Sequence, residues 1–186
     1  MEVGAYDGVS LSNTYFFENL GWSGICLEPN PSAFEKLRRN RASTVVNAGV
    51  AAIPGTMAFL SLPSDLDLGS GFVDFFDANS LYANRSFVEQ ACKRGGRVVD
   101  VEVVNLNRLL GEHNVSHVDY LSIDAEGADW NILQSIDFIH FDIEVVSVEN
   151  VGLADKAASH MKRQGYDLIA VLGADEIYRK SSALRR

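Results

Sequence analysis

Glu2-Val3-Gly4-Ala5-Tyr6-Asp7-Gly8 opens the chain, and Gly24-Ile25-Cys26-Leu27-Glu28-Pro29-Asn30 follows after a stretch of helical character. The first stretch is typical of a short strand that ends in a glycine-containing turn, and the second of a strand that ends in a carboxylate. Glycine has no Cβ, so the backbone at positions 4 and 8 can turn sharply and lie close to a ligand. Glu28 lies 24 residues after Gly4, near the offset at which doubly wound folds place a carboxylate on ribose hydroxyls. The two stretches together predict a nucleoside-binding crevice.

The charges of the turn indicate which nucleoside compound it accepts. The dinucleotide fingerprint G-x-G-x-x-G is absent, and the acidic Glu2 and Asp7 flank the turn. Carboxylates there would repel a pyrophosphate but suit a cation, and S-adenosylmethionine carries a sulfonium and an amino group and has no phosphate. The turn therefore favours S-adenosylmethionine over NAD. A strand-turn-helix unit without any ligand remains the alternative at this point.

The length and composition of the chain exclude several classes of protein. The chain has 186 residues, of which 47% are hydrophobic, and a net charge of −9. This length predicts one domain over residues 1–186 with a single core. The acidic balance disfavours a nucleic-acid partner, which would call for a basic surface. We find no apolar run of the roughly 20 residues needed to span a bilayer and no signal-peptide pattern. Two cysteines, Cys26 and Cys92, make no disulfide framework and suit a reducing cytoplasm.

Strand and helix patterns alternate along the chain, which predicts a mostly parallel, doubly wound sheet with helices on both faces. A capping box, Ser32 to Glu35, is expected to open the second helix. The last two strands, 166–172 and 177–179, are expected to form an antiparallel hairpin. The other expected helices are 12–20, 86–94, 105–110, 129–136 and 156–164, and the other expected strands are 45–50, 57–62, 98–104, 120–124 and 144–148, with a mobile loop at 65–83.

The first strand is expected to be truncated, because strands usually span about five residues and only Met1 to Val3 precede Gly4. We interpret the chain either as a fragment or as one whose start was assigned late. Missing residues would weaken the fold and remove part of a cofactor lid.

Two blocks of sequence resemble the FkbM-type methyltransferases. The first comprises Val3 to Glu18 and Gly21 to Pro31, and the second comprises Val118 to Gly127 and Ile143 to Glu149. The resemblance runs from residue 2 to about residue 172, and residues 63–96 match poorly. It implies a class I methyltransferase fold, which is a Rossmann-like, mostly parallel sheet with an antiparallel C-terminal strand. It also implies S-adenosylmethionine as methyl donor, usually for O-methylation of small hydroxylated or sugar-containing molecules.

The donor is expected to lie along the carboxyl ends of the first strands. Glu28 is predicted to bind both ribose hydroxyls; a surface carboxylate before a proline turn is the alternative. Asn13 and Thr14 could meet the donor carboxylate or simply cap a helix. The full predicted donor-binding set follows: Glu2 or Asp7 near the ammonium, Gly4, Ala5, Tyr6 and Gly8 around the methionine part, Asn13 and Thr14, Glu28, Pro29 and Asn30 near the adenosine, and Ala48 and Gly49 near the adenine.

Asp124 and Glu126 are the predicted catalytic residues, because they follow the strand end nearest the expected acceptor. A crowded carboxylate there could have a raised pKa and act as general base. The pair could instead bind a divalent cation together with Glu149, although no dedicated metal site is assigned. Glu126 and Gly127 could also merely begin a helix. The histidines lack ligand spacing, and His113 is the only one considered near an acceptor.

The segment 68–82 is expected to build the acceptor pocket, as an insertion at about 63–96. Phe72, Phe75, Phe76 and Tyr82 could form an apolar wall over the substrate or could pack on the sheet. We therefore predict an S-adenosylmethionine-dependent O-methyltransferase that acts on a small hydroxylated metabolite or a saccharide. A non-catalytic binding or scaffold domain of the same fold is the alternative, and a nicotinamide-linked oxidoreductase is the second. The sequence does not identify the acceptor or the oligomeric state.

Overall fold

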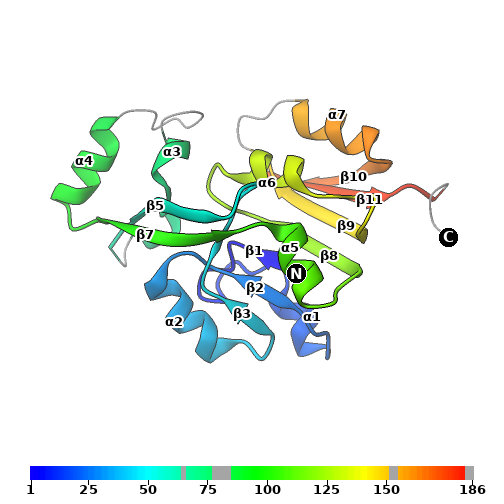
Figure 1. Ribbon diagram of the computed structural model, residues 1–186, viewed down its shortest axis with the longest axis horizontal. Coiled ribbons are helices and arrows are strands. Elements are labelled where there is room, and N and C mark those ends of the chain that lie inside the picture. Colours follow the sequence, from blue (N-terminus) through cyan, green and yellow to red (C-terminus); the bar gives the residue numbers. More distant parts are fainter. Residues whose placement is uncertain (64–65, 77–84, 151–154, 183–186) are drawn as a thin grey trace.

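The computed structural model describes residues 1–63, 66–76, 85–150 and 155–182 (Figure 1). Its larger sheet has seven strands in the order β10-β11-β9-β8-β1-β2-β3. Strands β3, β2, β1, β8 and β9 are parallel, whereas β11 runs antiparallel between β9 and β10. The mostly parallel sheet and the antiparallel C-terminal hairpin are thus confirmed. The strands are β1 Glu2–Val3, β2 Ile25–Leu27, β3 Thr44–Val46, β8 His117–Ile123, β9 Asp142–Glu149, β10 Tyr166–Leu172 and β11 Asp175–Lys180.

Strand β1 has only two residues, yet it lies in the middle of the large sheet. Glu2 and Val3 pair with Cys26 and Leu27 of β2 on one side and with the end of β8 on the other. The Val3 side chain is buried in the main apolar core, to which β2, β8 and β9 also contribute. This central position brings the turn after β1 between the ends of β2 and β8.

A second sheet of four strands, in the order β4-β7-β5-β6, lies beside the first. The single strand predicted at 45–50 is wrong: the chain leaves the large sheet after Val46, and Gly49–Val50 (β4) pairs instead with β7. The strands predicted at 57–62 and 98–104 are β5 Gly55–Ser61 and β7 Arg97–Val104, which pair with each other in this second sheet.

The loop predicted at 65–83 is wrong for the part that the structure describes. That part forms a 3-10 turn, η1 Asp67–Gly69, the strand β6 Gly71–Phe72 and the short helix α3 Val73–Phe76. Phe72 packs edge-to-face on Phe59 of β5, with ring centroids 5.3 Å apart. This apolar contact fixes a segment whose Gly, Asp and Ser content is typical of loops. Residue 65 and residues 77–83 of the prediction lie outside the described residues.

The remaining helices are α1 Tyr15–Asn19, α2 Pro31–Asn40, α4 Arg85–Lys93, α5 Leu106–Glu112, α6 Asp129–Ser135 and α7 Lys156–Arg163. The capping box predicted at Ser32 to Glu35 is wrong. Asn30 is the N-cap of α2, and its side-chain oxygen accepts a hydrogen bond from the Ser32 N–H at 3.1 Å. Proline is favoured at the first helical position, so Pro31 moves the start of the helix forward.

In the described part of the chain, no helix is long and apolar enough to cross a membrane.

A buried ion network joins β1 to both helices that follow it. The Arg41 side chain is only 2% exposed; its Nη1 lies 3.1 Å from Glu2 and its Nε 2.9 Å from Glu18. Burial would raise the pKa of Glu18, but hydrogen bonds from Ser43, Ala42 and Arg41 lower it to about 2. The guanidinium therefore compensates two carboxylates that would otherwise be costly inside the protein.

Replacing Arg41 should destabilise the fold strongly. We expect Arg41→Met to lower the free energy of unfolding by about 3–5 kcal/mol, because Glu2 and Glu18 would lose their buried counter-charge. Urea denaturation measures the change. Arg38→Met is the matched control, because Arg38 is exposed and pairs with Glu35 on the surface, and its loss should cost less than about 1 kcal/mol. Equal effects of the two substitutions would refute a structural role for the network.

Candidate active site

A pocket of about 140 Å³ opens at the carboxyl ends of β1, β2 and β8, with residues of the second sheet on its other side. Most of the residues predicted to bind donor or to act in catalysis line it. These are Glu2, Gly4, Ala5, Tyr6, Asn13, Glu28, Pro29, Asn30, Ala48, Gly49, Asp124 and Glu126. Asp7, Gly8 and Thr14 are not among its lining residues. Twelve of the fifteen predicted residues therefore lie along this pocket, and their roles in binding or catalysis stay predictions.

Gly4 is required where the turn passes the end of β8. Its φ is +80°, and a Cβ at this position would lie 1.6 Å from the carbonyl oxygen of Asp124. The Gly4 and Ala5 N–H groups both donate to the Leu27 carbonyl, at 3.0 and 2.9 Å. No other residue type could approach Asp124 so closely. The turn is thereby held against the ends of β2 and β8 together.

Glu28 lies at the end of β2 and is 6% exposed. Its Oε2 accepts a hydrogen bond from the Tyr6 N–H at 2.8 Å, and its Oε1 accepts one from the Asn30 N–H at 2.7 Å. Burial raises the pKa of Glu28 to about 7, helped by the nearby charges of Asp124 and Asp67 and opposed by the two N–H groups. Each carboxylate oxygen still has a lone pair that could accept a hydroxyl of a ligand.

Glu2 and Thr14 are engaged inside the protein. The Glu2 carboxylate accepts hydrogen bonds from the Ser12 hydroxyl, the Asn13 N–H and the Thr14 hydroxyl, and it also meets Arg41. These contacts replace the first turn of the helix predicted at 12–20, which begins only at Tyr15. A role of Glu2 or Thr14 in donor binding stays a prediction, and the contacts that the structure gives them are structural.

Asp7 organises the turn itself. Its carboxylate accepts hydrogen bonds from the Val9 N–H and from the N–H and hydroxyl of Ser10. Gly8, with φ +82°, packs against Leu37 and Arg41, where a Cβ would lie 2.7 and 2.6 Å from their side chains. Asn13 does line the pocket, and its side-chain amide donates to the Ser122 hydroxyl at 3.1 Å.

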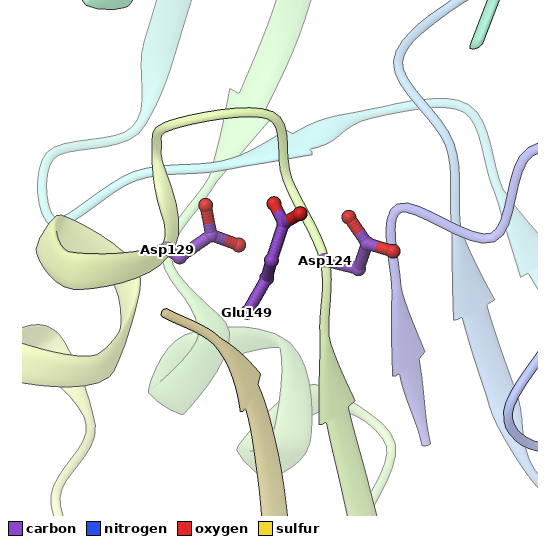
Figure 2. A group of neighbouring side chains, drawn as sticks. All are labelled: Asp124, Asp129 and Glu149. Atoms are coloured by element: carbon purple, nitrogen blue, oxygen red, sulfur yellow. The ribbon is translucent and has the colours of Figure 1, made fainter. Parts of the chain in front are cut away.

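Three carboxylates meet where β8 and β9 end (Figure 2). One oxygen from each of Asp124, Asp129 and Glu149 lies within 4.8 Å of the others, an arrangement that a divalent cation could accept. Burial raises the pKa of Asp124 to about 6 and that of Glu149 to about 8, with the neighbouring carboxylates adding to both shifts. The Asp129 oxygens also accept the N–H groups of Ala125 and Gly127, at 2.7 and 3.0 Å.

Glu126 lies beside this group and not within it. It lines the pocket with a left-handed backbone (φ +47°), and burial, with the charges of Asp124 and Asp129, raises its pKa to about 7. The alternative that Glu126 and Gly127 begin a helix is wrong, because α6 starts at Asp129. Asp129 was missed as a site residue; its signal was a carboxylate in the first turn of α6, the helix that follows β8 after a short loop.

Aromatic residues of the predicted apolar wall have different positions. Phe72 lines the pocket, and its ring fills the space where a Cβ on Gly49 would lie, 2.2 Å away. Phe75 packs on Phe72, with centroids 6.1 Å apart, and passes near Gly127. Tyr82 and the side chain of Phe76 lie outside the described residues. His113 lines a different cavity, together with Met1 and Cys26 at the amino ends of the strands.

The carboxylates should make stability fall as pH rises. Their folded pKa values of about 6, 7 and 8 for Asp124, Glu126 and Glu149 exceed the unfolded values of about 4. The folded protein thus holds protons that the unfolded chain releases, and stability present at low pH is lost as pH rises through the folded values.

We therefore expect Glu149→Gln to raise Tm at pH 8 and to have little effect at pH 5. Each 1 kcal/mol regained should add about 2–4 °C in a domain of this size. Differential scanning fluorimetry at both pH values measures this, with the exposed Glu102→Gln as control. A Glu149→Gln protein that melts like the control at pH 8 would contradict the proposed charge repulsion.

Comparison with known proteins identifies the family of this chain. The family model described as the methyltransferase FkbM domain matches residues 2–168. A relative, methyltransferase sdnD of Sordaria araneosa, is 27% identical over 168 residues, which cover 77% of this chain and 64% of the relative. The chain thus spans less than two thirds of that protein's length. No solved structure gives a significant match. Because the family model covers most of the chain, including the turn after β1 and the ends of β2, β8 and β9, this protein belongs to the family of FkbM methyltransferase domains.

Proposed function

We propose that this domain transfers a methyl group from S-adenosylmethionine to a hydroxyl of a small metabolite or a saccharide. The observation that carries the proposal is the buried carboxylate of Glu28 beside the glycine turn, in a pocket at the strand ends. Membership of the methyltransferase family supports the reaction. The strand order, with β11 antiparallel between β9 and β10, supports assigning the sheet to the Rossmann-like, doubly wound methyltransferase fold.

The residues of the pocket fit this donor better than a dinucleotide. The described lining residues include Glu2, Glu28, Asp67, Asp124 and Glu126 but neither lysine nor arginine. Glu2 and Asp67 are paired with Arg41 and Lys36. A pyrophosphate would still meet the carboxylates of Glu28, Asp124 and Glu126, which form no ion pair in the described part of the chain, whereas a sulfonium and an ammonium would be attracted to them. This charge balance disfavours the nicotinamide-linked alternative.

Each part of the pocket has a proposed task in binding the donor. Glu28 accepts the ribose hydroxyls, and the N–H groups from Tyr6 and Asn30 hold its carboxylate in place. The turn around Gly4 and the side chain of Asn13 face the methionine part. Ala48, Gly49 and Phe72 form the apolar surface for the adenine.

S-adenosylmethionine supplies a methyl group that its sulfonium already activates for in-line displacement. The protein has to align the acceptor oxygen with that methyl group and take up the hydroxyl proton. We assign the proton to a carboxylate oxygen of Asp124, whose pKa of about 6 leaves it mostly ionised at neutral pH. Glu126, with a pKa of about 7, is the second carboxylate of this side of the pocket.

The Glu28 carboxylate should be required for donor binding. We expect the wild-type chain to bind S-adenosylmethionine and its demethylated product but not NAD in calorimetric titrations. Glu28→Gln should weaken both affinities at least about tenfold, because charged hydrogen bonds to the ribose contribute roughly 1.5–3 kcal/mol. The exposed Glu35→Gln on α2 is the control. A folded wild-type chain that binds neither compound would favour the non-catalytic scaffold instead.

Asp124 should be required for turnover. We expect Asp124→Asn to abolish methyl transfer to a hydroxylated acceptor while donor affinity changes less than about threefold, because the acceptor proton would have no base. Unchanged turnover would exclude the role. Asp124, Asp129 and Glu149 could instead bind a cation. Assays of the wild-type chain with a chelator, and then with added Mg²⁺, distinguish this cation site from a general base. Activity that is lost with the chelator and restored by Mg²⁺ would assign these carboxylates to the cation.

We also propose the cytoplasm as location. In the structure Cys26 is buried and Cys92 exposed, and both are free thiols, which suits a reducing compartment.

A further inference from the structure

Tyr6 and Asn30 each contact Glu28 through a backbone N–H. Their side chains contact a second segment, Asp67–Ser70, which we call the covering segment. It contains η1 and leads into β6. The Tyr6 N–H and the Asn30 N–H hold the two oxygens of Glu28. The Tyr6 hydroxyl donates to Asp67 Oδ1 at 2.7 Å, and the Asn30 amide approaches the Ser70 hydroxyl at 3.5 Å. Two parallel connections therefore run from the covering segment to one carboxylate.

Tyr6 keeps an unfavourable backbone conformation to make its connection. Its φ is +48°, and a left-handed conformation costs a residue other than glycine about 1 kcal/mol or more. Glycine would avoid this cost but has no hydroxyl to reach Asp67. The Lys36 ammonium lies 5.4 Å from the centre of the Tyr6 ring and 3.5 Å from Asp67 Oδ2. The ring, the carboxylate and the ammonium thus form one contact group at the side of the pocket.

The covering segment is itself part of the pocket. Asp67, Leu68 and Ser70 line it, and Asp67 is 8% exposed. The Ser70 hydroxyl accepts the Leu62 N–H at 3.0 Å, which fixes the segment to the end of β5. A displacement of the segment would therefore move the backbone at Tyr6 and Asn30, which in turn holds Glu28.

We propose that the covering segment is a wall of the nucleoside part of the pocket, and that Tyr6 and Asp67 are positioning residues that hold Glu28 in place for the ribose of the donor. This inference rests on the proposed function and adds residues that act through Glu28. Its consequence is that donor binding and the order of the covering segment are thermodynamically linked, so each strengthens the other.

Removing the Tyr6 hydroxyl tests the connection. Tyr6→Phe keeps the ring beside Lys36 and removes only the hydrogen bond to Asp67. We expect calorimetry to show a donor affinity about three- to tenfold weaker, with KM for the donor raised by a similar factor and kcat changed less than about twofold. Tyr15→Phe on α1, outside the pocket, is the matched control and should leave both constants unchanged.

Removing the charge of Asp67 gives a result that a merely structural role would not produce. The charges that raise the pKa of Glu28 include Asp124 after β8 and Asp67 in η1. Lys36 of α2 pairs with Asp67. Asp67→Asn keeps an oxygen for the Tyr6 hydroxyl but removes the negative charge that raises the pKa of Glu28. Since the ionised Glu28 binds the ribose, the pH at which donor affinity is half-maximal should move to lower pH. Tyr6→Phe should leave this midpoint in place.

Hydrogen exchange of the wild-type chain supplies the second readout. Donor should slow exchange at the amides of residues 66–72, and Tyr6→Phe should reduce that protection, in proteins whose Tm shows that they are folded. This inference is overturned if the wild-type chain binds the donor and both variants keep its donor affinity, its pH midpoint and its protection from hydrogen exchange. The proposed function would then still stand. A folded wild-type chain that binds no donor would overturn both.

Discussion

The close approach of Gly4 to the end of β8 is the constraint on which the site depends. A Cβ at Gly4 would lie 1.6 Å from the Asp124 carbonyl oxygen, so any other residue would force β1 and β8 apart. Because β1 contributes only two residues to the sheet, it has few other contacts with which to resist such a displacement. The same turn carries the Tyr6 N–H that holds Glu28. One glycine therefore keeps the proposed ribose carboxylate and the proposed base in one pocket.

The carboxylates around this turn have two different electrostatic environments. Arg41 compensates Glu2 and Glu18 in a buried network, which ties the start of the chain to α1 and to the end of α2. In the described part of the chain, no lysine or arginine forms an ion pair with Glu28, Asp124 or Glu149. Burial, together with the charges of neighbouring carboxylates, raises their pKa values. The protein thus pairs the acids that hold its fold with a buried cation and, among the described residues, provides no such partner for these three carboxylates around the proposed site.

The second sheet connects the segment between β3 and β8 to the pocket. Phe72 of β6 fills the space beside Gly49, and Asp67 and Ser70 reach the residues that hold Glu28. The described part of residues 63–96 therefore contributes to the proposed donor pocket. The sequence predicts an acceptor pocket at 68–82. In the structure Asp67, Ser70 and Phe72 line the pocket that we propose for the donor.

The sequence by itself determined the features that depend on neighbouring residues and on one general rule of sheets. Alternating strands and helices, the glycine turn, and carboxylates at the ends of β2 and β8 were readable because parallel strands present their carboxyl ends at one edge. Only the tertiary structure decided which partners these residues take. It assigned Asp129 instead of Glu126 to the three-carboxylate group, Glu2 to Arg41, the two halves of 45–50 to different sheets, and Tyr6 to Asp67, 61 positions away. Such pairs arise from packing between distant segments, for which local sequence carries no periodic signal.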